Sequence, residues 1–222
     1  MSGDFSYVVK FQKRKTLSLY VLTDGSIEVR APLRTPQAHI VRFVETRASW
    51  VLKTRALQLQ RLHWQTPIEP GGPIWLLGEV LTLSVSRGES FSVKPAAPDL
   101  LVQTRDPDNR EALVRDLERW YRAQAQALFE QRLPLACRRF PDALALPELR
   151  LRRMRRRWGS CARDGRITLN TELVKLPLAV IDYVIVHELC HLFEFNHSAR
   201  FYQWLERVMP DWRPREARLR QF

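Results

Sequence analysis

The stretch His187–Ser198, HELCHLFEFNHS, holds three of the chain's five histidines and decides how its C-terminal part must fold. Its first five residues place His187 and His191 four apart around Glu188. On a helix of about 100° per residue, the two imidazoles lie within roughly 40° of each other on one face. Two histidines directed at one point are what a tetrahedral zinc ion requires, so the pattern predicts a zinc site.

The glutamate between the two histidines is the candidate catalytic residue. Glu188 lies about 80° to one side of the histidines, where its carboxylate reaches water on the metal without becoming a ligand. The opposite face carries the apolar residues of a buried stripe, namely Ile185, Leu189, Leu192 and Phe193. We therefore expect a helix with one buried side and one chemical side, and Glu188 as general base.

A third histidine, His197, follows His191 by six residues, which is the metzincin spacing, but Glu194 stands where metzincins have glycine. A continued helix would carry His197 about 15 Å from His187, too far for one ion. The helix must end before His197, and Asn196, which tolerates the left-handed conformation, is the expected break. We predict one Zn²⁺ per chain with His197 as third ligand. Glu194 is expected either to support a histidine or to face solvent.

Composition limits the class of protein. The 222 residues can form one large domain or two small ones, and 45% hydrophobic with 27% charged residues is ordinary for a globular chain. No apolar run follows the first residues, and the apolar stretch 176–186 is too short to cross a bilayer, so neither a signal peptide nor a membrane span is expected. Three cysteines without framework spacing favour a reducing compartment. We predict a cytoplasmic location.

The N-terminal part of the chain is expected to be β-rich. Residues 16–22 and 26–32 alternate around the Asp24-Gly25 turn and predict a hairpin. Helical periodicity then runs from Pro36 to about Leu62. Apolar patterning predicts further strands at 74–85, 89–95 and 100–104.

Helical patterns dominate the rest of the chain, and the shift in composition near residues 105–110 is the expected domain boundary. A long helix is predicted to begin at Asp106 or Asp108, and Pro134 is expected to kink or end it. Residues 149–161 and 166–170 are expected to pair as a hairpin around an Asp-Gly turn. The metal-site helix begins at Pro177 and runs through residue 195, and a last helix spans about 198–208. The predicted class is α+β, with a β-rich region containing one long helix at 1–105 and a catalytic domain at 106–222.

Positive charge is concentrated in one segment. The chain carries a net charge of +12, and six arginines lie within residues 150–157. Such a block is either a solvated face or a surface that attracts anions. The candidate anion-binding residues are Arg152, Arg153, Arg155, Arg156 and Arg157.

Several motifs together resemble one family. These are RRRWGSC (155–161), GRITLN (165–170), YVIVHELCHL (183–192), NHSARFYQWL (196–205) and MPDW (209–212), preceded by TDGSIEVRAP (23–32). In this order they resemble the YgjP-like metallopeptidases, relatives of the SprT-like zincins. The resemblance implies a zincin-like domain at 106–222, with zinc bound by His187, His191 and His197 and with Glu188 as general base.

The WGSC element leaves two interpretations open. In one, Trp158 packs, Gly159 permits a bulge and Cys161 fills a small buried space. In the other, Ser160 or a backbone N–H of the element points at the metal and helps to bind substrate. Trp158, Ser160, Glu194 and Asn196 are therefore kept as candidates for substrate binding or for support of the metal ligands.

Three functions fit these residues. The first is a zinc metallopeptidase, in which Glu188 takes a proton from zinc-activated water and a hairpin edge strand aligns an extended polypeptide. The second is a metal-dependent nucleoside-triphosphate pyrophosphohydrolase acting on a phosphate-bearing small molecule, because arginines suit phosphate geometry. The third is a protease or binding module recruited to nucleic acid by the arginine segment, which a steep salt dependence of binding would reveal.

Overall fold

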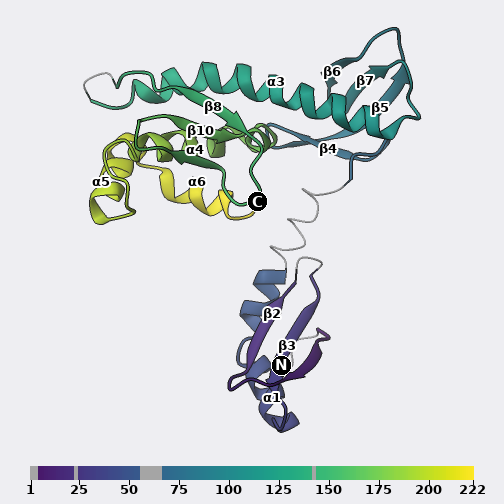
Figure 1. Ribbon diagram of the computed structural model, residues 1–222, viewed down its shortest axis with the longest axis vertical. Helices are drawn as coiled ribbons and strands as arrows, with labels where there is room; N and C mark the ends of the chain where they lie inside the picture. Colours follow the sequence, from purple (N-terminus) through teal and green to yellow (C-terminus); the bar gives the residue numbers. More distant parts are fainter. Residues whose placement is uncertain (1–4, 23–24, 56–66, 142–143) are drawn as a thin grey trace. The chain divides into compact units, whose positions relative to one another are not determined.

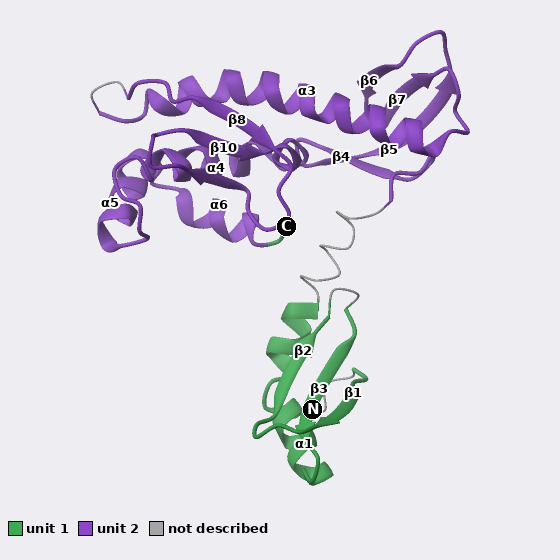
Figure 2. Ribbon diagram, viewed as in Figure 1, with its two compact units in different colours: residues 1–66, 221–222 green, residues 67–220 purple. Residues whose placement is uncertain are grey.

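The computed structural model describes residues 5–22, 25–55, 67–141 and 144–222. The chain forms two compact units, residues 1–66 with 221–222 and residues 67–220 (Figures 1 and 2). Small β-sheets occupy the N-terminal part, and the helices that carry the metal motif follow them. The structure therefore confirms the α+β class.

The first unit is a three-stranded sheet covered by a helix. Its strands, in the order β1-β3-β2, are β1 (Val8–Gln12), β3 (Ile27–Pro32) and β2 (Ser18–Val21). β2 and β3 form the predicted antiparallel hairpin, and β1 runs parallel to β3. Alternate residues of β3 pack against helix α1 (Gln37–Glu45) in a core of Val29, Ala31, Ile40 and Val44.

The long helix expected after Pro36 is interrupted. α1 ends at Glu45, where the Thr46 hydroxyl donates a hydrogen bond of 3.0 Å to the Phe43 carbonyl. A threonine that bonds back to the preceding turn competes with continuation of the helix. Helical structure resumes at residues 48–55, and the remainder of the predicted helix, 56–62, lies outside the described residues.

The second unit opens with a four-stranded sheet. Its strands, in the order β4-β5-β7-β6, are β4 (Pro73–Leu76), β5 (Glu79–Arg87), β7 (Asp99–Thr104) and β6 (Ser92–Ala96). The chain reverses at Leu77-Gly78, where both residues have positive φ, 52° and 89°. Two-residue hairpin turns of type I′ need this conformation, but leucine rarely adopts it, so the sequence predicted one strand through the turn.

This sheet belongs with the C-terminal half of the chain. The Gly78 N–H donates to the Lys175 carbonyl at 2.9 Å, and the Tyr121 hydroxyl donates to the Trp75 carbonyl at 2.6 Å. These contacts join the sheet to segments that follow it by many residues. The compact units accordingly divide at 66–67, whereas the composition of the chain changes near 105.

The long helix α3 (Arg110–Cys137) runs along the second unit (Figure 1). Its cap is Asn109, whose side chain accepts from the Ala112 N–H at 3.0 Å, next to the aspartates expected there. Of the two effects expected of Pro134, the helix does not end there: it continues to Cys137, and Ala136 and Cys137 are buried. Its buried side is a stripe at four-residue steps: Leu113, Leu117, Tyr121, Ala125, Phe129 and Leu133.

A second three-stranded sheet follows α3. Its strands, in the order β8-β10-β9, are β8 (Leu149–Arg152), β10 (Ile167–Asn170) and β9 (Gly159–Cys161). β9 and β10 form the predicted antiparallel hairpin, while β8 pairs in parallel with the other side of β10. β9 is therefore an edge strand of this sheet.

Four helical elements complete the unit: η1 (Thr171–Lys175), α4 (Leu178–Cys190), α5 (Ala199–Val208) and α6 (Trp212–Leu219). α4 contacts α3, α5, α6 and the strands β9 and β10, so it is buried on several sides. Arg132 of α3 binds Asp182 of α4 through two hydrogen bonds, the Nε–Oδ1 bond at 2.8 Å. α5 matches the predicted last helix; α6 was not foreseen. No helix among the described residues has the length and apolar composition to cross a membrane.

Candidate metal centre

The last turn of α4 presents two histidines on one face, as the sequence predicted. The ring centroids of His187 and His191 lie 4.9 Å apart. His191 is the C-terminal cap of α4, and its Nδ1 lies 3.0 Å from the carbonyl oxygen of Glu194. That contact holds the ring so that Nε2 is left to bind a metal, which is how histidine ligands are commonly oriented.

The helix ends earlier than predicted. α4 stops at Cys190, and the Glu194 N–H bonds back to the Cys190 carbonyl at 3.1 Å. Among described non-glycine residues only Leu77 has positive φ. The prediction of a left-handed conformation at Asn196 was therefore wrong. The contact between the His191 ring and the Glu194 carbonyl stabilises the earlier turn. Asn196 itself is exposed, and its N–H lies 3.3 Å from Glu194 Oε1.

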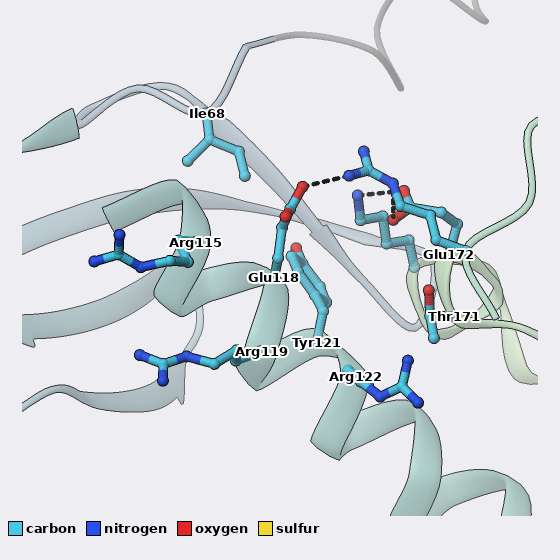
Figure 3. A pocket seen from close by; sticks show the side chains of 10 residues that line it. Ile68, Arg115, Glu118, Arg119, Tyr121, Arg122, Thr171 and Glu172 are labelled. Atoms are coloured by element: carbon cyan, nitrogen blue, oxygen red, sulfur yellow. Dashed lines mark hydrogen bonds and ion pairs between the residues drawn. The ribbon is translucent and has the colours of Figure 1, made fainter. Parts of the chain in front are cut away.

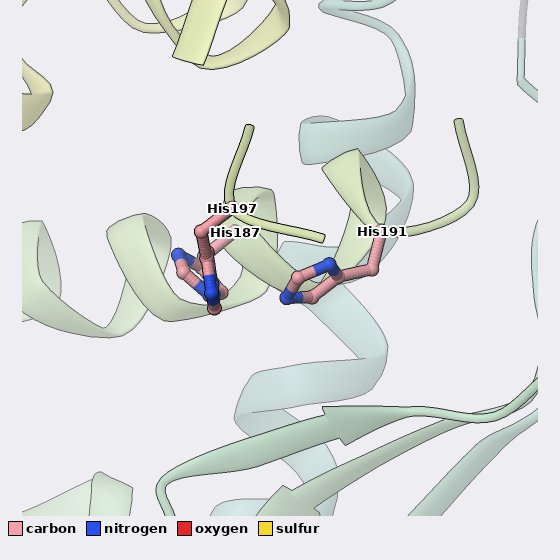
Figure 4. A group of neighbouring side chains, drawn as sticks. All are labelled: His187, His191 and His197. Atoms are coloured by element: carbon pink, nitrogen blue, oxygen red, sulfur yellow. The ribbon is translucent and has the colours of Figure 1, made fainter. Parts of the chain in front are cut away.

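The early turn returns His197 to the other two histidines (Figure 4). Its Nε2 lies 3.0 Å from Nε2 of His187, and one ligand atom from each histidine lies within 4.8 Å of the others. Two nitrogens bound to one tetrahedral zinc at 2.0–2.1 Å are about 3.3 Å apart. The three imidazoles therefore fit a single ion of this size.

Phe201 of α5 packs against all three histidine rings. Its ring centroid lies 4.9 Å from that of His187, 4.7 Å from that of His191 and 4.8 Å from that of His197, and its side chain is fully buried. Phe201 is an aromatic residue of the motif NHSARFYQWL, which resembles the family, but its contact with the three rings was not predicted. Phe201 lies in the first turn of α5, which begins two residues after His197, and this position is the signal that could have found it.

Burial keeps two of the histidines neutral. It lowers the pKa of His187 to about 3, with further lowering from the charges of His191 and His197. Burial also lowers the pKa of His191, against the opposing effect of the Glu194 carbonyl. Among the described residues, His187 Nδ1 is buried without a hydrogen-bond partner. Neutral imidazoles with free lone pairs are the form that binds a metal.

Glu188 is buried beside the histidines, with 6% of its surface exposed. Burial raises its pKa to about 8, and the positive charge of Arg157 acts in the opposite direction. The carboxylate lies against the backbone of β9, because a Cβ placed on Gly159 would be 2.5 Å from Glu188 Oε1. The sequence alone did not indicate this contact.

The WGSC element is β9 with the residue before it. Trp158 is half-buried, and its carbonyl accepts from the Asn170 N–H at 2.9 Å. Successive side chains of a strand point to opposite faces. Because the Gly159 position faces Glu188, the Ser160 hydroxyl points to the other face of the sheet. Its proposed direct role at the metal is therefore not favoured by this geometry.

Two arginines of the segment 150–157 are already paired, and the first is Arg150, whose Nε lies 2.7 Å from Glu148 Oε1. Arg153 binds Glu118 of α3 and lies 3.6 Å from Glu172 of η1 (Figure 3). These carboxylates neutralise its guanidinium. The arginine thus ties the loop after β8 to two helical elements.

The other four arginines of the segment are exposed. Arg152 ends β8, and Arg155 and Arg156 form no ion pair with a described residue. Arg157 is near enough to Glu188 to affect its carboxyl group. Of the five candidates, Arg157 is the one whose charge acts on Glu188 beside the histidine cluster.

Comparison with known proteins identifies the family of the chain. The model of the family "YgjP-like, metallopeptidase domain" matches residues 15–222. No curated protein matches the chain. Among solved structures, the metallopeptidase zymogen of Pyrococcus abyssi abylysin is similar at 25% identity, over 40% of this chain and 90% of that chain, with a TM-score of 0.37. Because the family model covers nearly the whole sequence, the chain belongs to the YgjP-like metallopeptidase family and is a peptidase of the hydrolase class.

Proposed function

We propose that this chain hydrolyses peptide bonds with one zinc ion held by His187, His191 and His197, and with Glu188 as general base. The observation that carries the proposal is the approach of three imidazoles to one point beside a buried carboxylate. Three protein ligands leave a fourth position free, as in catalytic zinc sites. The proposal assigns the catalytic segment to residues 106–222.

In this proposal the zinc ion and Glu188 have separate roles in the reaction. A zinc ion in this site would supply Lewis-acid activation of water and of the scissile carbonyl. Glu188 would accept a proton at its carboxylate from the attacking water and deliver it to the leaving amine nitrogen. Its burial against β9 limits the positions that its carboxylate can take.

The edge strand β9 supports a polypeptide substrate. The Trp158 carbonyl accepts from the Asn170 N–H of β10, and the Ala162 N–H donates to the carbonyl of Arg166, the residue before β10, at 2.9 Å each. In an antiparallel pair these bonds alternate along the strand, so the N–H and C=O groups of Gly159 and Cys161 point away from β10. An extended peptide could add to this edge as a further strand.

The arginine segment gives less support to a phosphate-bearing substrate. The carboxylates of Glu118 and Glu172 compete with any phosphate for the Arg153 guanidinium. Arg155 and Arg156 form no ion pair within the described part of the chain and are exposed, which is the usual state of a solvated charged face. We therefore favour a polypeptide over the nucleotide and nucleic-acid alternatives.

Removal of the metal tests the proposed function. Zinc-loaded protein is expected to cleave an unfolded polypeptide such as fluorescently labelled casein, and prolonged dialysis against a chelator should abolish cleavage. One equivalent of Zn²⁺ should restore it, whereas Mg²⁺, which prefers octahedral oxygen ligands, should not. Fluorescence release measures the rate. Cleavage that survives complete loss of metal, or no cleavage at full zinc occupancy, would contradict the proposal.

We also keep the prediction of a cytoplasmic location, which the thiols support. All three cysteines are free: Cys137, Cys161 and Cys190. Burial raises the pKa of each thiol, which lowers its reactivity in the folded protein. Titration of denatured, unreduced protein should therefore find three thiol groups per chain. A single group would indicate a disulfide and argue for an oxidising compartment.

A further inference from the structure

The absence of a side chain at Gly159 leaves space for the side chain of Glu188. A Cβ at this position would lie 2.5 Å from Oε1, 2.7 Å from Cγ and 2.8 Å from Cδ of Glu188. All three distances are below 3.0 Å, which real Cβ atoms essentially never show. Gly159 is not among the glycines with positive φ, so its backbone would suit any residue. The requirement for glycine here is therefore space for Glu188.

Asn170 fixes the loop that leads into β9. It is 3% exposed, and its Nδ2 donates to the carbonyls of Met154 and Arg157, both at 2.8 Å. Its Oδ1 accepts from the Met154 N–H at 3.3 Å and from the Glu172 N–H at 3.1 Å. An asparagine side chain has two donors and two acceptor sites, so this one is saturated.

The backbone of Asn170 also helps to hold the loop that leads into β9. Its N–H donates to the Trp158 carbonyl at 2.9 Å, one residue before Gly159. At the other end of the loop, Arg153 is paired with Glu118 and Glu172. The arginine-rich loop is thus held by α3, η1 and β10, and it enters β9 in one defined position.

We propose that Gly159 and Asn170 are positioning residues for the general base. Asn170 holds the loop that sets β9, and β9 presents the bare Cα of Gly159 to the side of Glu188. The carboxylate then has one place to lie, between α4 and the strand. This assigns a role to the WGSC element, and the part that concerns turnover rests on the proposed function.

A double-mutant cycle in stability tests the contact without relying on activity. Gly159→Ala is expected to lower the melting temperature by at least about 3 °C in protein that retains Glu188. In a Glu188→Ala background most of that shift should disappear, because the atoms that the new methyl group meets are gone. Both metal-free and zinc-loaded protein are measured. An equal shift in the two backgrounds overturns the proposal, even if peptidase activity is never found.

Kinetics on labelled casein test the consequence for the general base. Gly159→Ala should lower kcat at least ~10-fold at full zinc content, with KM within about twofold, since a displaced base weakens proton transfer. A raised KM with unchanged kcat would mean that only the edge strand had moved, and would overturn the proposal. Absence of activity in the wild-type protein would instead sink the proposed function and leave the stability cycle to decide the contact.

Asn170→Ala should likewise lower kcat more than it changes KM, without loss of zinc. Asn170→Asp, which keeps the acceptor oxygen but not the donor, serves if the alanine variant does not fold. Asn109→Ala is the matched control: it removes an asparagine that caps α3, so it should lower the melting temperature and leave kcat unchanged. Folded Asn170 variants with wild-type kcat and full zinc would contradict the role given to Asn170.

Discussion

His197→Ala is expected to leave the purified protein almost without zinc, and His191→Ala is expected to do the same. Each variant reduces the site to two protein ligands, which cannot hold the ion at a catalytic site that needs three. We expect the affinity for zinc to fall by at least ~100-fold, because even loss of an outer partner of a ligand costs 10–100-fold. Elemental analysis should find about one zinc per chain in wild-type protein, and competition with a chromogenic chelator gives the affinity. Hydrolytic activity should be lost together with the metal.

His39→Ala is the matched control, because His39 is an exposed histidine of α1 in the other compact unit. It should keep the full zinc content. If His197→Ala also kept it, Glu194 would become the better third ligand, since its carboxylate is half-buried in the same turn. Glu206 of α5, the next glutamate along the chain and the other alternative ligand, is less available, because its carboxylate already binds Trp212 Nε1 at 2.6 Å and Arg213. A wild-type protein that binds no zinc would overturn the site.

The parts of this site that the sequence predicted are those set by local geometry. The four-residue spacing of His187 and His191 places both rings on one helix face regardless of the rest of the protein. The distance argument likewise required a break before His197. The position of that break depends on the contact between the His191 ring and the Glu194 carbonyl. Helix propensity alone cannot predict such a contact. Spacing therefore selected the candidate ligands, whereas the break expected at Asn196 misplaced the end of α4 by five residues.

Contacts between segments far apart in the chain could not be predicted from the sequence. Nothing in WGSC indicates that Gly159 faces Glu188, because the two residues are separated by a hairpin, η1 and most of α4. The turn at Leu77-Gly78 was missed for a related reason. Leucine at positive φ is locally unfavourable, and the contacts of the turn with the segment after η1, such as Gly78 with Pro177, hold it in place. These contacts also put the sheet β4–β7 in the second unit.

Glu188→Gln should separate the role of general base from that of scaffold. Glutamine keeps the size of the side chain and its capacity for hydrogen bonds, so it fits the space beside Gly159, but it cannot accept a proton at neutral pH. We expect normal zinc content and a melting temperature at or slightly above that of the wild type, because a buried group that can ionise has been replaced by a neutral one.

Turnover of labelled casein by Glu188→Gln should fall by at least ~100-fold in kcat, the lower end of what a positioned general base contributes. KM should change little, because the residue is not expected to bind the polypeptide before the chemical step. Glu79→Gln, an exposed glutamate at the start of β5, controls for loss of a carboxylate and should behave as wild type. Retained activity would mean that another group takes the proton, whereas loss of zinc would make Glu188 part of the metal-binding structure. Only a fall in kcat at full zinc occupancy fits a carboxylate that lies beside the three histidines without being one of the ligands.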